Sequence, residues 1–306
     1  MAFNSSYNTS ISSLIDLNNS NFTAKSDPLF EIPWLTLRLF ICLVGIINSC
    51  LLMLVVWRDR STSTGTRLLV LSLFFSACLL CGIFVPAASV INGLPTLFQS
   101  QNPRNLVCSM YTGAQFCLMT FGFTDVSLAI NRLIAVCLPH EFTSWQSTRI
   151  CCIMVGLSWS LAFLTVILPV FDVGGSYVLL PDMRCTMKAS SRLGTATQFF
   201  IGVIPYSLVG LFSFVIFTTV YLKKRRLQKA PSVTMRYKYQ MLHKHLFIAK
   251  AMALLLIVNL ITSLPYIVTL AAAPAMFKRP VVGHIVTTLP LISYALNPVS
   301  IIYCYL

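Results

Sequence analysis

Charged residues are scarce in this chain. Asp, Glu, Lys and Arg make up 10% of its 306 residues, and only eight residues are acidic. A soluble globular protein carries about 25% charged residues, so this composition argues against a soluble domain. Hydrophobic residues account for 57% of the chain, and its mean hydropathy is +0.80. The composition therefore indicates a protein whose surroundings are largely lipid.

Catalytic and metal-binding patterns are also missing from the sequence. It contains no phosphate-binding loop, no Ser/His/Asp arrangement and no CxxC pair beside a histidine. Most of the 11 cysteines lie in apolar stretches, where cysteine behaves as a small hydrophobic residue. Cys151 and Cys152 are adjacent, and adjacent residues on a helix point in different directions. We expect no enzymatic activity, no metal site built from cysteine and histidine, and no organic cofactor.

Long apolar runs are abundant. A membrane-spanning helix needs about 20 mostly apolar residues. Seven such stretches are present, at 33–57, 66–92, 106–131, 149–170, 195–222, 246–272 and 281–305. They lack the period-two alternation of a membrane β-barrel, and only the connection 223–245 is long. The pattern predicts an all-α integral membrane protein, a seven-transmembrane helix bundle.

The basic residues predict an extracellular N-terminus. With this orientation the inner segments hold 14 Lys and Arg residues, nine of them from Lys223 to Lys250, and the outer segments hold eight. An excess of Lys and Arg marks the cytoplasmic side of membrane proteins. The net charge of +14 is therefore explained by topology and by attraction to anionic lipids, without nucleic-acid binding.

The N-terminal tail gives an independent indication of the same topology. Four Asn-X-Ser/Thr glycosylation acceptors lie within its first 21 residues, at Asn4, Asn8, Asn18 and Asn21. We expect residues 1–32 to be a disordered, glycosylated extracellular tail, and residues 33–306 to be the transmembrane domain of a multi-pass plasma membrane protein. On the same outer side, Cys108 begins the third span and Cys185 lies in the loop before the fifth. Oxidising surroundings favour a disulfide between them.

One landmark in nearly every span resembles the rhodopsin-like (class A) G-protein-coupled receptors, over almost the whole chain. The matching residues are Asn48 in "GIINSC", Arg132 and Pro139 in "NRLIAVCLP", Trp159, Pro169, Pro205, Pro265, and Asn297 with Pro298. The Asn131-Arg132 pair resembles the variant of melatonin-receptor-like and related invertebrate receptors. The resemblance implies a cell-surface receptor that couples binding of an extracellular ligand to activation of a heterotrimeric G protein.

The resemblance also implies roles for particular residues. Arg132, with Asn131 and Pro139, would form the G-protein coupling region. The activation switch would comprise Pro205, Pro265, Asn297, Pro298, Asn48 and Asp125. Alternatively, Arg132 is only an anchor at the interface between lipid and water. Because Asn131 replaces the family's aspartate, Arg132 lacks a neighbouring carboxylate. We expect the closed state to be held less firmly and basal activity to be raised.

Several other switch positions depart from the family pattern. Alignment on Pro86 places Ala77 where the second helix usually carries a sodium-binding aspartate, and Ser263 replaces the sixth-helix tryptophan. Asp125 is the one carboxylate within the predicted spans. It lies two helical turns before Arg132, about 10 Å deeper in the membrane. An ionisable residue there is a functional candidate. Asp125 would hold a sodium ion or a proton near Asn48, Asn259 and Asn297, or would be a neutral structural acid.

The outer halves of the spans limit the ligand class. Residues 111–118 contain no acid, which argues against an amine ligand, and span 281–305 contains no lysine for a retinal Schiff base. The candidate pocket residues are Gln115, Tyr111, Gln198, Tyr206, Tyr266, His284 and Tyr294, among apolar neighbours. Basic residues at the mouth favour a weakly acidic, lipid-like or peptide ligand. Two other functions stay open: a receptor-like binding protein that does not couple to G proteins, and a transporter or channel.

Overall fold

A computed structural model describes residues 28–59, 63–93, 103–138, 142–179, 185–228, 257–259, 261–265, 268 and 280–305. The predicted tail with Asn4, Asn8, Asn18 and Asn21, the loop residue Pro139 and the pocket residue Tyr266 lie outside these ranges. The same is true of most of the predicted sixth span.

Long helices dominate the described chain, and they follow the predicted spans closely. They are α2 (Pro28–Arg58), α3 (Thr64–Leu79), α4 (Val85–Gly93), α5 (Pro103–Cys137), α7 (Thr148–Val170), α8 (Arg192–Gln228) and α10 (Pro280–Tyr305). The short helix α6 (Phe142–Trp145) precedes α7. Within the described residues, five helical segments are long and apolar enough to cross a membrane, and Val281–Asn297 in α10 is a shorter apolar helix. Most helices extend past the predicted apolar limits, because a helix continues beyond the hydrocarbon core.

Local sequence explains where several of these helices begin and bend. Pro28 opens α2, a position where its missing N–H costs nothing, and Glu31 in the first turn complements the helix dipole. Ser63 caps α3 by accepting a hydrogen bond from the Thr66 amide. Between α3 and α4, the π-helical segment η1 (Leu80–Phe84) widens the helix just before Pro86. Pro86 lacks the N–H that a regular α-helix would use there.

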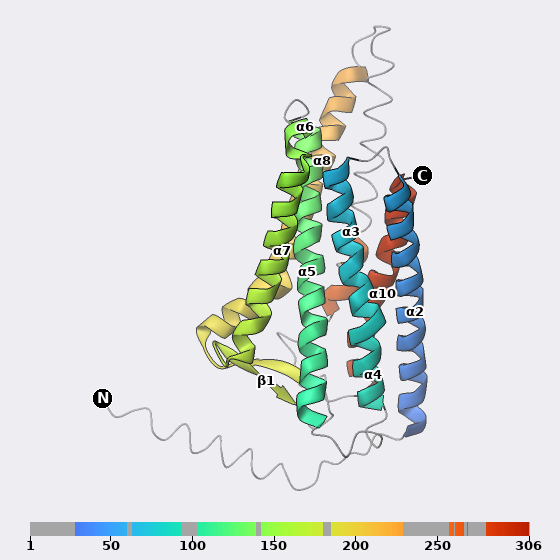
Figure 1. Ribbon diagram of the computed structural model, residues 1–306, viewed down its shortest axis with the longest axis vertical. Coiled ribbons are helices and arrows are strands. Elements are labelled where there is room, and N and C mark those ends of the chain that lie inside the picture. Colours follow the sequence, from blue (N-terminus) through green and yellow to red (C-terminus); the bar gives the residue numbers. More distant parts are fainter. Residues whose placement is uncertain are drawn as a thin grey trace, which may run out of the picture.

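The helices pack as one bundle with α5 at its centre (Figure 1). α5 contacts α3, α7 and α8, while α2 packs on α3 and on α10. The two strands β1 (Gly175–Leu179) and β2 (Cys185–Ala189) pair antiparallel, with Leu179 opposite Cys185. This hairpin lies at the end of the bundle where α2 begins (Figure 1). That end is therefore the outer one in the predicted topology.

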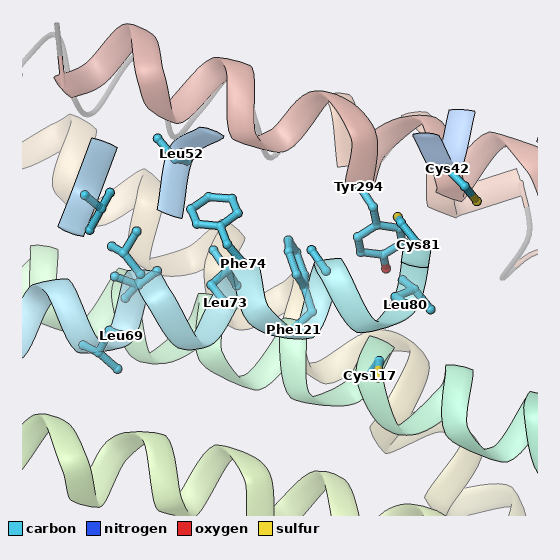
Figure 2. Close-up of a cluster of buried hydrophobic side chains, with 14 of the residues drawn as sticks. Cys42, Leu52, Leu69, Leu73, Phe74, Leu80, Cys81, Cys117, Phe121 and Tyr294 are labelled. Atoms are coloured by element: carbon cyan, nitrogen blue, oxygen red, sulfur yellow. The ribbon is translucent and has the colours of Figure 1, made fainter. Parts of the chain in front are cut away.

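The largest core cluster lies among α2, α3, α5 and α10 (Figure 2). Phe74, Leu73 and Leu52 are at most 1% exposed, and Phe121 packs edge-on against Tyr294, with 5.0 Å between ring centroids. Because lipid is as apolar as leucine, close van der Waals packing holds such helices together. Gly45 shows how close this packing is: a Cβ atom there would lie 3.0 Å from the Cys81 sulfur.

Candidate functional site

At the inner end of the bundle, Asn131 joins α5 to α3. The Asn131 side-chain amide donates a hydrogen bond to Thr66 Oγ1 at 3.0 Å, and Asn131 is only 2% exposed. Ser63 Oγ donates to the same Thr66 oxygen at 3.0 Å. The next residue, Arg132, is half-buried on α5, five residues before this helix ends at Cys137. The side chain at 131 is therefore committed to α3 and brings no negative charge to Arg132.

A second polar contact closes the same end of the bundle. Lys223 Nζ, on α8, donates a hydrogen bond to the Val136 carbonyl oxygen at 2.6 Å. This carbonyl belongs to the last turn of α5, where the helix leaves its carbonyl groups unpaired. Sequence reasoning counted Lys223 only as a topology determinant. The pairing was not foreseeable, because the two residues are 87 positions apart.

In the middle of the bundle, Asp125 lines a small cavity between α5, α8 and α10. Its other lining residues are Phe121, Gly122, Pro205, Tyr206, Val209, Asn259 and Tyr294. The cavity has room for about one water molecule. The lining residues include one carboxylic acid, one amide and two phenols, and oxygen is the ligand that hard cations prefer. The residues present therefore fit a small monovalent cation or a proton.

Hydrogen bonds tie the cavity wall together. Tyr206 and Tyr294 bring their hydroxyls within 3.3 Å, which joins α8 to α10. Ser293 Oγ donates to Asn259 Oδ1, which joins α10 to the sixth span. The predicted pocket residues Tyr206 and Tyr294 thus lie at the same cavity. The predicted switch residues Asp125 and Pro205 line it as well. Because four helical segments contribute to the wall, movement of any one of them changes the cavity.

The three asparagines expected near Asp125 lie in different surroundings. Asn259 lines the cavity. Asn48 donates a hydrogen bond to the Ala295 carbonyl at 3.0 Å and so joins α2 to α10. Asn297 is 3% exposed, and its Oδ1 has no hydrogen-bond partner among the described residues. Ala77, at the position of the missing aspartate, is 1% exposed in the core.

The remaining landmarks occupy structural positions. Trp159 Nε1 donates to Ser72 Oγ at 2.9 Å and joins α7 to α3. Pro169 is buried in the last turn of α7, and Pro265 is half-buried in the helical segment 261–265. The side chain of Pro298 lies outside the described residues.

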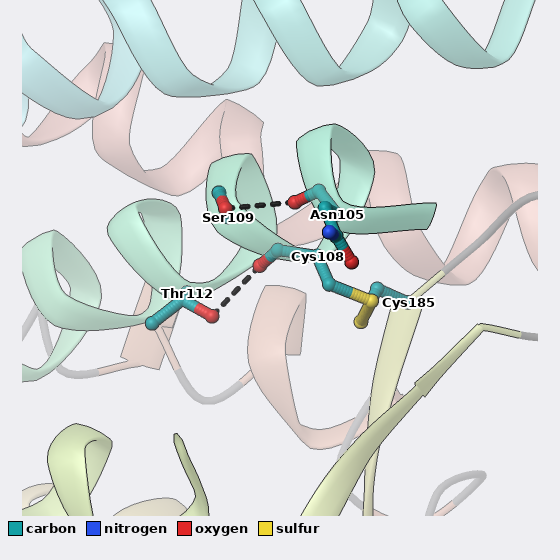
Figure 3. Close-up of a disulfide and its surroundings, with 5 residues drawn as sticks. All are labelled: Asn105, Cys108, Ser109, Thr112 and Cys185. Carbon is teal, nitrogen blue, oxygen red and sulfur yellow. Dashed lines mark hydrogen bonds between the residues drawn. A yellow bond between two sulfur atoms is a disulfide. The ribbon is translucent and has the colours of Figure 1, made fainter. Parts of the chain in front are cut away.

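At the outer end, the predicted disulfide is confirmed (Figure 3). Cys108 of α5 is bonded to Cys185 of β2, with a Cα–Cα distance of 5.2 Å. Tyr111 packs edge-on against Tyr177 of β1, with 5.9 Å between ring centroids. Burial raises the pKa of Tyr177 to about 12, although a hydrogen bond with Thr112 opposes this shift. The hairpin is therefore fixed on the outer end of α5, and Tyr111 faces the hairpin.

The other predicted pocket residues are not brought together at the cavity. Gln115 is half-buried on α5, and the Gln198 side chain lies outside the described residues. His284 lies against α2, where its ring stacks on Trp34 with 5.4 Å between centroids. His284 Nε2 is 3.2 Å from a carboxylate oxygen of Glu31, and Nδ1 is 3.1 Å from Arg38 Nη2. Sequence reasoning missed this cluster, because nothing in the local sequence indicates which side chains α2 presents to His284.

Within the described ranges, no group of three or more His, Cys, Asp or Glu residues is suited to a metal ion.

Comparisons with known proteins agree on one family. The sequence profile described as "7 transmembrane receptor (rhodopsin family)" matches residues 48–303. Olfactory receptor 1D2 of Homo sapiens is 26% identical over 226 residues, which cover 67% of this chain and 67% of that receptor. Cholecystokinin receptor type A of Mus musculus is 28% identical over 133 residues, which cover 42% of this chain and 29% of that receptor.

A solved structure is similar in fold. The crystal structure of squid rhodopsin superposes with a TM-score of 0.75, covering 90% of this chain and 81% of that one, at 15% sequence identity.

Proposed function

This chain belongs to the rhodopsin family of seven-transmembrane receptors, and we propose that its Arg132-bearing inner end activates a G protein with raised basal activity. It is a multi-pass plasma membrane protein, a cell-surface receptor that couples to G proteins. The family and the fold are those of receptors and not of enzymes.

The observation that carries the proposal is the hydrogen bond between Asn131 and Thr66. A carboxylate at position 131 would attract Arg132 and hold it against the closed bundle. Asn131 keeps the polar link to α3 but supplies no charge, so the cost of moving Arg132 is lower. A receptor whose inactive state is less stabilised populates its active state more often without ligand.

We further propose that an outer ligand acts through the cavity at Asp125. A ligand shifts the population by its differential affinity for the two states, and a hundredfold preference supplies about 2.7 kcal/mol. Tyr206 and Tyr294 join α8 to α10 at this cavity, so rearrangement of their contact would accompany the shift. The candidate ligands are weakly acidic, lipid-like or peptidic, and a sodium ion or a proton at Asp125 would favour one of the two states.

The experiment is a comparison of basal G-protein activation in cells. Wild type and Arg132→Ala are expressed at matched surface levels and assayed against each class of Gα subunit. Arg149→Ala is the control, because Arg149 is an exposed basic residue at the start of α7 on the same side of the membrane. We expect Arg132→Ala to abolish the wild-type signal and the control to preserve it. Equal signals from wild type and Arg132→Ala would refute the role of Arg132.

A further inference from the structure

A cluster of charged and polar side chains lies between the outer halves of α2 and α10, outside the Asp125 cavity. α2 contributes Glu31, Trp34 and Arg38, and α10 contributes His284 with two threonines. Arg38 Nη2 donates to Thr287 Oγ1 at 2.6 Å, and Arg38 Nε donates to Thr288 Oγ1 at 3.1 Å. Charged side chains are rare within membrane-spanning segments and mark functional sites there.

The contacts of His284 fix where its proton sits. Arginine has only hydrogen-bond donors, so Nδ1 of His284, 3.1 Å from Arg38 Nη2, must be an acceptor without a proton. Nε2 then carries the single proton and donates it to the Glu31 carboxylate at 3.2 Å. The arrangement described here therefore requires a neutral imidazole between a cation and an anion.

A second proton on His284 is incompatible with this arrangement. It would occupy Nδ1 and point at the guanidinium of Arg38, which would place two donors and two positive charges face to face. The Glu31 carboxylate and the face of the stacked Trp34 ring would stabilise the imidazolium. Arg38 would then have to leave Nδ1 while Glu31 stays, so the cluster has two distinct states that differ by one proton.

Among the described residues, Glu31 connects this cluster to the outer side, and few other charges lie near it. The side chain of Glu31 is 22% exposed at the outer start of α2, whereas that of His284 is 5% exposed. Helix α4, which packs on α2, contains no ionisable residue, and η1 contributes only Cys81. In the described chain, the charged groups that face the imidazole are therefore Glu31 and Arg38.

We propose that Glu31, His284 and Arg38 form an extracellular proton-binding site that controls the contact between α2 and α10. In mildly acidic surroundings His284 takes up a proton from the outer side, Arg38 is displaced from its ring, and the outer half of α10 is held less firmly. The ligand of this site is the proton itself. Histidine is suited to this role because it titrates near physiological pH.

Trp34 provides a local reporter of this site, because a protonated imidazole quenches the fluorescence of an indole stacked on it. The purified receptor in lipid nanodiscs is titrated from about pH 8 to about pH 5, the range in which histidine changes charge. Subtracting the curve of Trp34→Phe isolates the Trp34 signal from the other three tryptophans. Thermal unfolding of the same samples reports the strength of the helix contact.

The wild-type Trp34 signal should fall on acidification, and the melting temperature should decrease with it. His284→Gln, a neutral residue that can still accept from Arg38 and donate to Glu31, should flatten both curves. Arg38→Gln should move the fluorescence midpoint up, and Glu31→Gln should move it down, each by about one pH unit or more. His243→Gln, in the basic inner loop by sequence, should leave the curves as in wild type.

A Trp34 signal that does not change with pH in wild type would overturn the proposal, as would a His284→Gln variant that titrates like wild type. A Trp34 signal that changes with pH while the melting temperature stays constant would refute the claim that this site controls the contact between α2 and α10. Neither readout needs a ligand or a G protein. The test therefore stands even if the proposed signalling role of Arg132 fails.

Discussion

Asn131→Asp is the substitution that most directly probes the inner end of the receptor. Asn131 is 2% exposed and donates to Thr66 Oγ1, and aspartate has nearly the same shape. The Thr66 hydroxyl can turn and donate to the new carboxylate, so the link between α5 and α3 is preserved. What changes is one negative charge on the residue that directly precedes Arg132 in α5.

The magnitude follows from the position of Arg132. Two opposite unit charges about 4 Å apart attract each other by about 4 kcal/mol at an effective dielectric constant of about 20. Arg132 is only half-buried, and solvent screening reduces the net value of such a pair to about 1 kcal/mol. Because 1.4 kcal/mol corresponds to a factor of ten in an equilibrium, basal activity per receptor should fall about fivefold.

The assay is ligand-free G-protein activation, normalised to the number of receptors at the cell surface. Thr66→Val is the matched control, because it removes the acceptor for Asn131 without adding charge. Leaving the buried Asn131 amide unpaired costs about 1–3 kcal/mol of stability, so the control should lower expression without lowering activity per receptor. Unchanged basal activity in Asn131→Asp would refute the argument that a missing carboxylate raises it.

Three further predictions concern the middle and the outer end of the bundle. Replacing sodium chloride with N-methylglucamine chloride should change nucleotide exchange in wild-type membranes and leave Asp125→Asn unaffected; no sodium effect in wild type would eliminate the ion site. Cys185→Ser removes a crosslink between residues 77 positions apart, which in the chain-entropy account lowers the free energy of unfolding by roughly 4.5 kcal/mol. Its surface expression should fall sharply in a flow-cytometric assay, and wild-type expression would contradict the prediction. Trp159→Phe loses the hydrogen bond to Ser72, so the free energy of unfolding should fall by about 1 kcal/mol and the melting temperature should fall with it. Ser72→Ala should produce a similar drop, and an unchanged value in both would show that this bond contributes nothing.

The sequence predicts the helix bundle well, because a membrane places one strong constraint on every segment that crosses it. Each spanning segment must satisfy its own backbone hydrogen bonds, so a long apolar run can be assigned to a helix without knowledge of its neighbours. Predicted span 149–170 corresponds to α7, Thr148–Val170. The disulfide between Cys108 and Cys185 was also predictable, because topology places both residues on the outer side.

Contacts between distant residues were not predictable in this way. Arg38 and His284 are 246 positions apart, and nothing in either local sequence indicates that the two helices present them to each other. The same holds for Asn131 and Thr66, which are 65 positions apart. These pairs depend on helix rotation and tilt, which packing determines and hydropathy does not.

The hairpin and the π-helical segment were missed for a different reason. Residues 175–179 and 185–189 lie outside the spans, where hydropathy carries no information about strand pairing. A proline inside a helix, such as Pro86, bends or distorts it. Its position alone does not distinguish a kink from the widened turn at Leu80–Phe84.

In the proposed function, the inner end around Arg132 activates a G protein without ligand. The most direct measurement reconstitutes purified receptor in nanodiscs with a purified heterotrimer and follows guanine-nucleotide exchange. The proposed function predicts faster exchange with wild type than with empty nanodiscs, and loss of that acceleration in Arg132→Ala. Acceleration that is identical in wild type and Arg132→Ala, or absent with every class of heterotrimer, would contradict it.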